Sequence, residues 1–252
     1  MEEAKIKNLR VKGQVKRKQS IVGILLWINL GVFLLQMMLP SINKYFVLTS
    51  QNALLQPWRL VTHMFMHASF SHIFFNMYAL MLFGPLIEKR IGRKRFIWFY
   101  LIAGIIAGLA FIGFDHLKYF LGWDNVYGSA VGASGAIMGV IGLVIMLLPQ
   151  MKVLFFFVIP MSMRTAGFIF AAIDIIGMFN LNSSVANIAH LAGLACGLLY
   201  GSYLIKQKKK YQEKFTNKPK YTSKVHKSTD PNNVVIELSE EDINEYLKNG
   251  NL

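Results

Sequence analysis

Charged residues are scarce in this chain, and long stretches of it contain none. Only 16% of its 252 residues are charged, whereas 54% are hydrophobic and the mean hydropathy is +0.41. This composition excludes an ordinary soluble globular domain. The sequence also has a single cysteine, Cys196, which excludes an intrachain disulfide and leaves the redox environment open.

A cleavage pattern of small residues is missing after the first apolar stretch. That stretch also begins late and is long for the apolar core of a signal peptide, so we expect it to remain in the protein as a helix. We find no convincing internal repeat, which counts against a transporter built from two related halves.

The uncharged stretches have the length of membrane-spanning helices. Crossing a hydrocarbon core of about 30 Å takes about 20 helical residues. The fifth stretch is the least regular, because Pro160, Arg164 and Asp174 lie in or just before it. The sequence therefore predicts an all-α membrane protein, a bundle of six transmembrane helices at about residues 21–39, 70–87, 96–114, 131–148, 165–179 and 185–205.

Positive charge is concentrated in alternate connections between these spans. Seven Lys and Arg residues precede the first span, five follow the second and ten follow the sixth, whereas the alternate loops, on the opposite side of the membrane, hold only Lys44, Arg59 and Lys118. This asymmetry predicts that both termini are cytoplasmic. It also explains the net charge of +14 by topology and attraction to anionic lipid, so we expect a lipid bilayer rather than nucleic acid as partner.

Three parts follow along the chain. Residues 1–20 form a basic cytoplasmic tail, and residues 21–205 form the membrane domain. Residues 206–252 form a second cytoplasmic tail, basic and then acidic, with a short helix expected at 240–248 after Ser239 as N-cap. We assign no function to this tail and no oligomeric state to the protein.

Four polar residues fall at one depth near the outer ends of three predicted spans. Spans two, four and six all run from outside to inside, and their first turns hold His72, Asn76, Ser134 and His190. Each residue alone could be an ordinary packed and hydrogen-bonded helix residue. Together they indicate a functional site, because polar groups inside a membrane are energetically expensive.

Glycines predict close packing of the fourth and sixth spans. Small residues recur every four positions in both, at Gly135 and Gly139 and again at Gly193, Gly197 and Gly201. This pattern lets helix backbones approach closely. We expect it to bring Ser134 within hydrogen-bond distance of His190.

The chemistry of this group is that of a serine nucleophile. A serine hydroxyl needs an adjacent base, and His190 is the candidate. His72, Asn76 and the backbone N–H of Ser134 could stabilise an oxyanion. Asp174 is the only acid inside a span; we interpret it as structural, with a catalytic role as the alternative, and therefore predict a Ser-His dyad.

A metal site is the rival interpretation of the histidines. His63 and His67 are four residues apart, and His72 would complete three ligands. On a continuous helix, however, His72 would lie about 180° from His63. The H-E-x-x-H pattern is also missing. We therefore predict no metal and no cofactor, and expect His63 and His67 to support the first outer loop.

The ordered set of motifs resembles the rhomboid family of intramembrane serine proteases. The resemblance covers about residues 21–205 and includes His63, His67, His72 and Asn76. Its other motifs are Trp58-Arg59, the G-x-x-x-E-x-x-x-G pattern of Gly84, Glu88 and Gly92, Gly132-Ala133-Ser134-Gly135, and Ala189-His190 followed by Gly193 and Gly197.

This resemblance implies Ser134 as nucleophile, His190 as general base, and Asn76, His72 and the Ser134 backbone as the oxyanion site. It implies cleavage of peptide bonds in or near the transmembrane helices of other proteins, without metal or cofactor. One departure is Met138, because many members have an aromatic residue four positions after the nucleophile. A thioether can also pack against a ring.

Two other functions remain open from the sequence: a non-catalytic rhomboid-like protein that binds membrane clients, and a small transporter. The intact Ser134 and His190 count against the first, and the missing repeat counts against the second. The loops suggest a bacterial-type plasma membrane with the site near its outer face, with an organelle inner membrane as the alternative.

Overall fold

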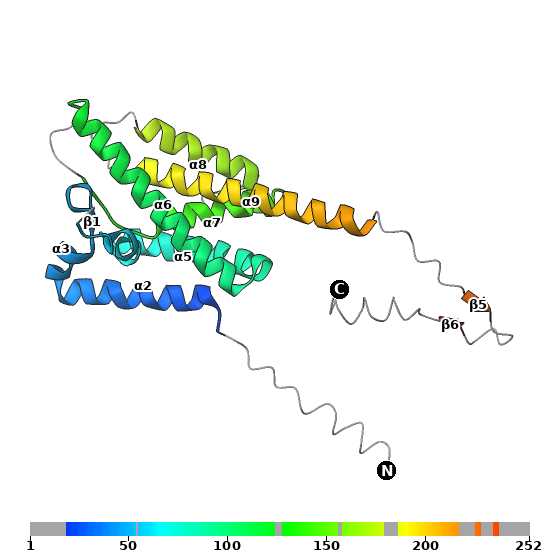
Figure 1. Cartoon of the computed structure of the whole chain (residues 1–252). Coiled ribbons are helices and arrows are strands. Elements are labelled where there is room, and N and C mark those ends of the chain that lie inside the picture. The colour runs from blue at the N-terminus through cyan, green and yellow to red at the C-terminus, as the bar shows by residue number, and fades with distance from the viewer. Residues whose placement is uncertain are drawn as a thin grey trace, which may run out of the picture. The chain divides into compact units, whose positions relative to one another are not determined.

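The computed structural model describes residues 19–53, 55–123, 128–155, 158–178, 186–216, 225–227 and 234–236. The chain divides into two compact units, Met1–Ile205 and Lys206–Leu252, which are described separately. The first unit is built mainly from long helices (Figure 1). The predicted all-α class is therefore confirmed.

Long helices occupy all six places where the sequence predicts a span. They are α2 (Ile21–Met38), α5 (Phe70–Ile91), α6 (Arg93–Phe120), α7 (Ser134–Leu147), α8 (Met163–Met178) and α9 (Ala186–Thr216). Among the described helices, α2, α5, α6 and α9 are long and apolar enough to cross a membrane. The 14 residues of α7 reach only about 21 Å, less than the hydrocarbon core.

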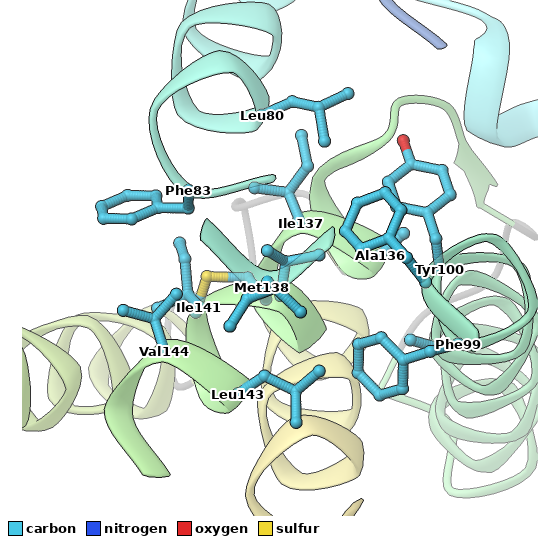
Figure 2. Packing of buried hydrophobic residues seen from close by; sticks show 14 of the residues in the cluster. Leu80, Phe83, Phe99, Tyr100, Ala136, Ile137, Met138, Ile141, Leu143 and Val144 are labelled. Atoms are coloured by element: carbon cyan, nitrogen blue, oxygen red, sulfur yellow. The ribbon is translucent and has the colours of Figure 1, made fainter. Parts of the chain in front are cut away.

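The short helix α7 lies in the core of this unit. Its residues 135–144 are all buried, and it packs against α5, α6 and α8. Figure 2 shows its side chains among those of Phe83 from α5 and Phe99 from α6. A helix that is apolar on every side is expected in a core. Because α7 is buried, the residues in its first turn are held in a fixed position.

Glycines let α7 and α9 pack at very short distance. A Cβ added at Gly193 would collide with the carbonyl oxygen of Gly135, and one added at Gly197 would collide with that of Gly139. Only hydrogen fits at these two positions of α9. The close packing predicted from the glycine spacing is thus confirmed.

Two helices extend beyond their uncharged stretches. Only Gly92 separates α5 from α6, and α6 continues to Phe120 instead of ending near residue 114. Gly92 has φ = 82°, a left-handed conformation that favours glycine. Charged side chains do not stop a helix once it leaves the apolar layer, so the uncharged stretches predict spans better than helix ends.

Glu88 joins α5 to the start of α2. Its carboxylate accepts hydrogen bonds from the backbone N–H groups of Ile21 at 2.8 Å and Val22 at 3.1 Å, and from the hydroxyl of Ser20. One turn earlier, Gly84 makes room for α2, since an added Cβ would lie 2.7 Å from Cγ2 of Val22. The glycine and the glutamate of this motif therefore hold two helices together, and the carboxylate caps N–H groups that a helix start leaves unpaired.

The segment between α2 and α5 folds into short elements. They are η1 (Pro40–Ile42), α3 (Asn43–Phe46), β1 (Leu48–Thr49), η2 (Ser50–Asn52), α4 (Arg59–Thr62) and η3 (His63–Phe65). Buried Arg59 donates to the carbonyl oxygens of Lys44 and, at 2.6 Å, of Val47. β1 pairs antiparallel with β2 (Ser129–Ala130), which ties this segment to the residues just before α7.

The described residues also include two more strand pairs. β3 (Lys152–Phe155) pairs antiparallel with β4 (Ile159–Ser162) before α8, and β5 (Val225–Lys227) pairs antiparallel with β6 (Val234–Ile236) in the second unit. Neither pair was predicted from the sequence. The helix expected at 240–248 lies outside the described residues, as do residues 1–18 of the basic tail.

Candidate active site

Ser134 is the first residue of α7, and Gly132 shapes the turn before it. Gly132 has φ = 112°, and its N–H donates to the carbonyl oxygen of His63 at 2.8 Å. An added Cβ there would lie 2.7 Å from Nε2 of His72, so both the backbone and this neighbour require glycine. Ser134 thereby stands at a helix start, where the first N–H groups have no partner within the helix.

His190, in the second turn of α9, reaches Ser134. Its Nε2 atom lies 2.8 Å from Oγ of Ser134, and both residues are half-buried. The contact depends on the glycine-lined packing of α7 against α9. A hydroxyl at this distance can pass its proton to the imidazole nitrogen.

The other ring nitrogen of His190 faces a carboxylate. Nδ1 lies 3.0 Å from Oδ1 of Asp174, a buried residue of α8. From the sequence we interpreted Asp174 as structural, with a catalytic role as the alternative, because the sequence gives the depth of Asp174 but not its position around α8 relative to α9. The available signal was a lone acid in an apolar helix.

His72 and Asn76, one turn apart on α5, both approach Gly132. An added Cβ at Gly132 would lie 2.7 Å from Nε2 of His72 and 3.5 Å from Nδ2 of Asn76. Asn76 is 6% exposed, and its Nδ2 is buried without a hydrogen-bond partner among the described residues. A buried donor without an acceptor is unfavourable unless a ligand supplies the acceptor. The structure thus brings all four polar residues predicted for the site to one place.

A cavity opens beside the Ser134 hydroxyl. Its volume is about 310 Å³, and Ala107, Gly108, Gly135 and Ala189 give it a wall of small side chains. His72 also lines it, and Phe111 bounds it from α6. A space of this size beside a nucleophile can hold a substrate side chain or several water molecules.

His63 and His67 are buried beneath the segment that leads to α5. The Nδ1 atom of His63 lies 2.8 Å from the carbonyl oxygen of Arg59, and burial lowers the pKa of His63 to about 4. Burial also lowers the pKa of His67 to about 4. Both rings are therefore neutral at pH 7. Within the described ranges, no three His, Cys, Asp or Glu residues come together as metal ligands.

Met138, where many rhomboids have an aromatic residue, is a core residue. It is 8% exposed and packs in the cluster that Figure 2 shows around α7, one turn below Ser134. Neighbouring Ile141 and Phe83 belong to the same cluster. Packing of Met138 on the imidazole stays a prediction.

Asp115 supports the site and was missed from the sequence. This buried residue of α6 accepts hydrogen bonds from the hydroxyl of Ser50 and, at 2.8 Å, from the backbone N–H of Gly128. It thus fixes the chain just before β2. It was missed because it lies one residue beyond the expected end of the third span, at residue 114, and so did not count as a charge inside a span.

Comparison with known proteins places this geometry in one family. Residues 54–207 match the model of the rhomboid domain. The chain is 34% identical to YdcA of Bacillus subtilis over 60% of its own length and 69% of that protein. It is 29% identical to Rhomboid protein 1, mitochondrial, of Saccharomyces cerevisiae, over 78% of this chain and 56% of the relative.

A human relative, Presenilin-associated rhomboid-like protein, mitochondrial, is 33% identical over 74% of this chain and 48% of its own length. The chain thus spans about half the length of the mitochondrial relatives. The match to the domain model covers more than half of the chain and includes Ser134, His190, all of α5 and α7 and most of α9. This chain belongs to the rhomboid family.

Proposed function

We propose that the protein is an intramembrane serine endopeptidase that hydrolyses peptide bonds in or near transmembrane segments of other membrane proteins. The carrying observation is the 2.8 Å distance between Oγ of Ser134 and Nε2 of His190, beside a cavity at the start of a buried helix. Family membership supports the proposal, and one relative, from Bacillus subtilis, is named Rhomboid protease GluP.

Ser134 starts the reaction. Its Oγ attacks the carbonyl carbon of the scissile peptide bond while its proton passes to Nε2 of His190. The imidazolium then gives this proton to the leaving nitrogen, the C–N bond breaks, and an ester links the substrate to Ser134. The small residues around the cavity leave room for the side chain next to the scissile bond.

The oxyanion of the tetrahedral intermediate needs donors that are already in place. Nδ2 of Asn76 is one, because it is buried and has no acceptor among the described residues. The Ser134 backbone N–H at the start of α7 is a second, and His72 is a third when its Nε2 carries a proton. The His72 and Asn76 nitrogens both lie close to Gly132, two residues before Ser134.

Water completes the cycle. A water molecule in the cavity attacks the ester carbonyl while His190 takes its proton, and the proton returns to Oγ of Ser134 as the acid product leaves. No step of this scheme uses a metal or a cofactor.

The distribution of charge supports one orientation in the membrane. We propose that both termini lie on the cytoplasmic side and the start of α7 near the outer face, because the connections rich in Lys and Arg are expected to be cytoplasmic. Impermeant labelling of residues 206–252 tests this orientation. A bacterial plasma membrane fits the Bacillus relatives, and an organelle inner membrane fits the mitochondrial ones.

The test is labelling by a fluorophosphonate, which reacts with an activated serine. Purified wild type should be labelled and should cleave a membrane-anchored substrate. Ser134→Ala should lose both, with a fall in kcat of at least about 10³-fold, and His190→Ala should lose labelling. The control is Ser202→Ala, which removes a serine hydroxyl from α9 three turns beyond His190.

Cleavage retained by folded Ser134→Ala would reject the proposal. A wild type that is neither labelled nor able to cut any membrane-anchored substrate would favour the alternative, a non-catalytic protein that binds membrane clients. Thermal unfolding of each variant in detergent distinguishes loss of chemistry from loss of fold.

A further inference from the structure

We infer that Asp174 is a positioning residue that holds His190 in the tautomer and orientation in which Nε2 accepts the Ser134 proton. The inference rests on the proposed function and adds a third member to the predicted dyad. It begins from the contact between Oδ1 of Asp174 and Nδ1 of His190 at 3.0 Å.

Two contacts, not one, set the register between α8 and α9 at this point. Besides the Asp174–His190 pair, Asn187 packs directly against Gly177, where an added Cβ would collide with its amide. Asp174 and Gly177 are three residues apart, as are Asn187 and His190, so each pair occupies one helix face. The two helices run side by side in Figure 1, and the order of the contacts requires antiparallel packing. The contact between Asp174 and His190 is therefore part of the helix packing.

Burial makes this carboxylate costly without its partner. Asp174 is 6% exposed on a helix whose neighbouring residues are apolar. An ionised carboxylate in such a place needs a donor, and Nδ1–H of His190 supplies one. Among the described residues, His190 is the hydrogen-bond partner found for the Asp174 side chain.

The consequence for the reaction is specific. With Nδ1–H donated to Asp174, the lone pair of the neutral ring lies on Nε2 and faces the Ser134 hydroxyl. When Nε2 takes the proton, the nearby carboxylate stabilises the imidazolium, and Asp174 itself stays ionised throughout. Without the carboxylate, the ring can rotate or carry its hydrogen on Nε2. A protonated Nε2 has no lone pair to accept the Ser134 proton, so the ring cannot act as base there.

The test replaces the carboxylate by an amide of nearly the same shape. Asp174→Asn should lower kcat and the rate of fluorophosphonate labelling by about 10²-fold or more, with KM changed less than about threefold. The matched control is Glu88→Gln, which removes another buried carboxylate, 8% exposed, from α5, where it accepts hydrogen bonds from the start of α2. It should lower the unfolding temperature and leave kcat of the folded protein unchanged.

A measurement on the unchanged protein applies even if Asp174→Asn does not fold. ¹⁵N spectra of histidine-labelled wild type, compared with His190→Gln to assign the signal, should show hydrogen on Nδ1 of His190. Hydrogen on Nε2 would overturn the inference. An unchanged kcat in folded Asp174→Asn would also overturn the inference. If wild type were then labelled by fluorophosphonate and Ser134→Ala were not, the proposed function would still stand. A wild type without serine reactivity would reject both.

Discussion

Asn76 is a buried side chain whose hydrogen bonding is incomplete among the described residues. Its amide nitrogen is buried without an acceptor among the described residues, whereas Asn29, equally deep in α2, donates its amide nitrogen to the carbonyl oxygen of Leu25 at 2.8 Å. Both are asparagines on apolar helices. Only the first points toward the turn that precedes Ser134, so only its nitrogen is free to meet a developing negative charge.

Replacing this amide tests the oxyanion role. Asn76→Ala should lower kcat by about 10²-fold while KM changes little, because the donor acts mainly in the transition state. Asn29→Ala removes a similarly buried amide and should leave kcat unchanged. Kinetics with a fluorogenic transmembrane substrate in detergent give both numbers. Equal losses in the two variants would contradict a specific role for Asn76.

At the scale of helices, the site depends on backbone contact between α7 and α9. Gly135 and Gly139 on one helix meet Gly193 and Gly197 on the other, and no side chain fits between them. The distance between the serine and the histidine is set by this contact, because each residue lies within two turns of a glycine that touches the other helix. Any added methyl group must separate the helices.

Gly193→Ala is the corresponding prediction. The added methyl group would meet the carbonyl oxygen of Gly135, so we expect a loss of about 1–3 kcal/mol in stability and a fall in fluorophosphonate labelling. Gly31→Ala is the control, because an added Cβ on that face of α2 meets nothing within 4 Å. It should be neutral or slightly stabilising. Normal labelling of Gly193→Ala would show that the close packing does not set the site.

At the scale of the whole molecule, uncharged runs predicted the places of the six helices, and their polar exceptions predicted the site. The sequence predicts how deep a residue lies along a span, because the apolar runs set the ends of that span. It predicted the position of a residue around the helix axis only where glycines marked one face, as on α7 and α9. The helix α8 has only Gly167 and Gly177, ten residues apart, and no glycine repeat every four positions, which is why the Asp174 contact was not expected. The short strands before α7 and α8 were also unreadable, because two to four residues give no period.

Stability of the whole fold should depend on pH through His63 and His67. Their folded pKa values of about 4 lie below the ordinary value of 6.5, so between these values the unfolded chain binds more protons than the folded one. The free energy of unfolding should therefore fall as pH drops from 6.5 toward 4, by up to about 3 kcal/mol for each ring.

Unfolding temperatures in detergent from pH 7.5 to pH 4.5 provide the measurement. The slope should become smaller in His67→Gln, which removes one of the two buried rings. His116→Gln should keep the full slope, because His116 is an exposed residue of α6. A pH-independent unfolding temperature in the wild type would contradict the burial of neutral histidines.

The order of the helices along the chain has a consequence for synthesis. Ser134 leaves the ribosome 56 residues before His190, on a helix about 21 Å long that is too short to cross the bilayer alone. The imidazole that faces Ser134 is on α9, the last of these helices to be synthesised. Under the proposed mechanism, the nascent chain therefore has no base for its serine until the last helix is in place.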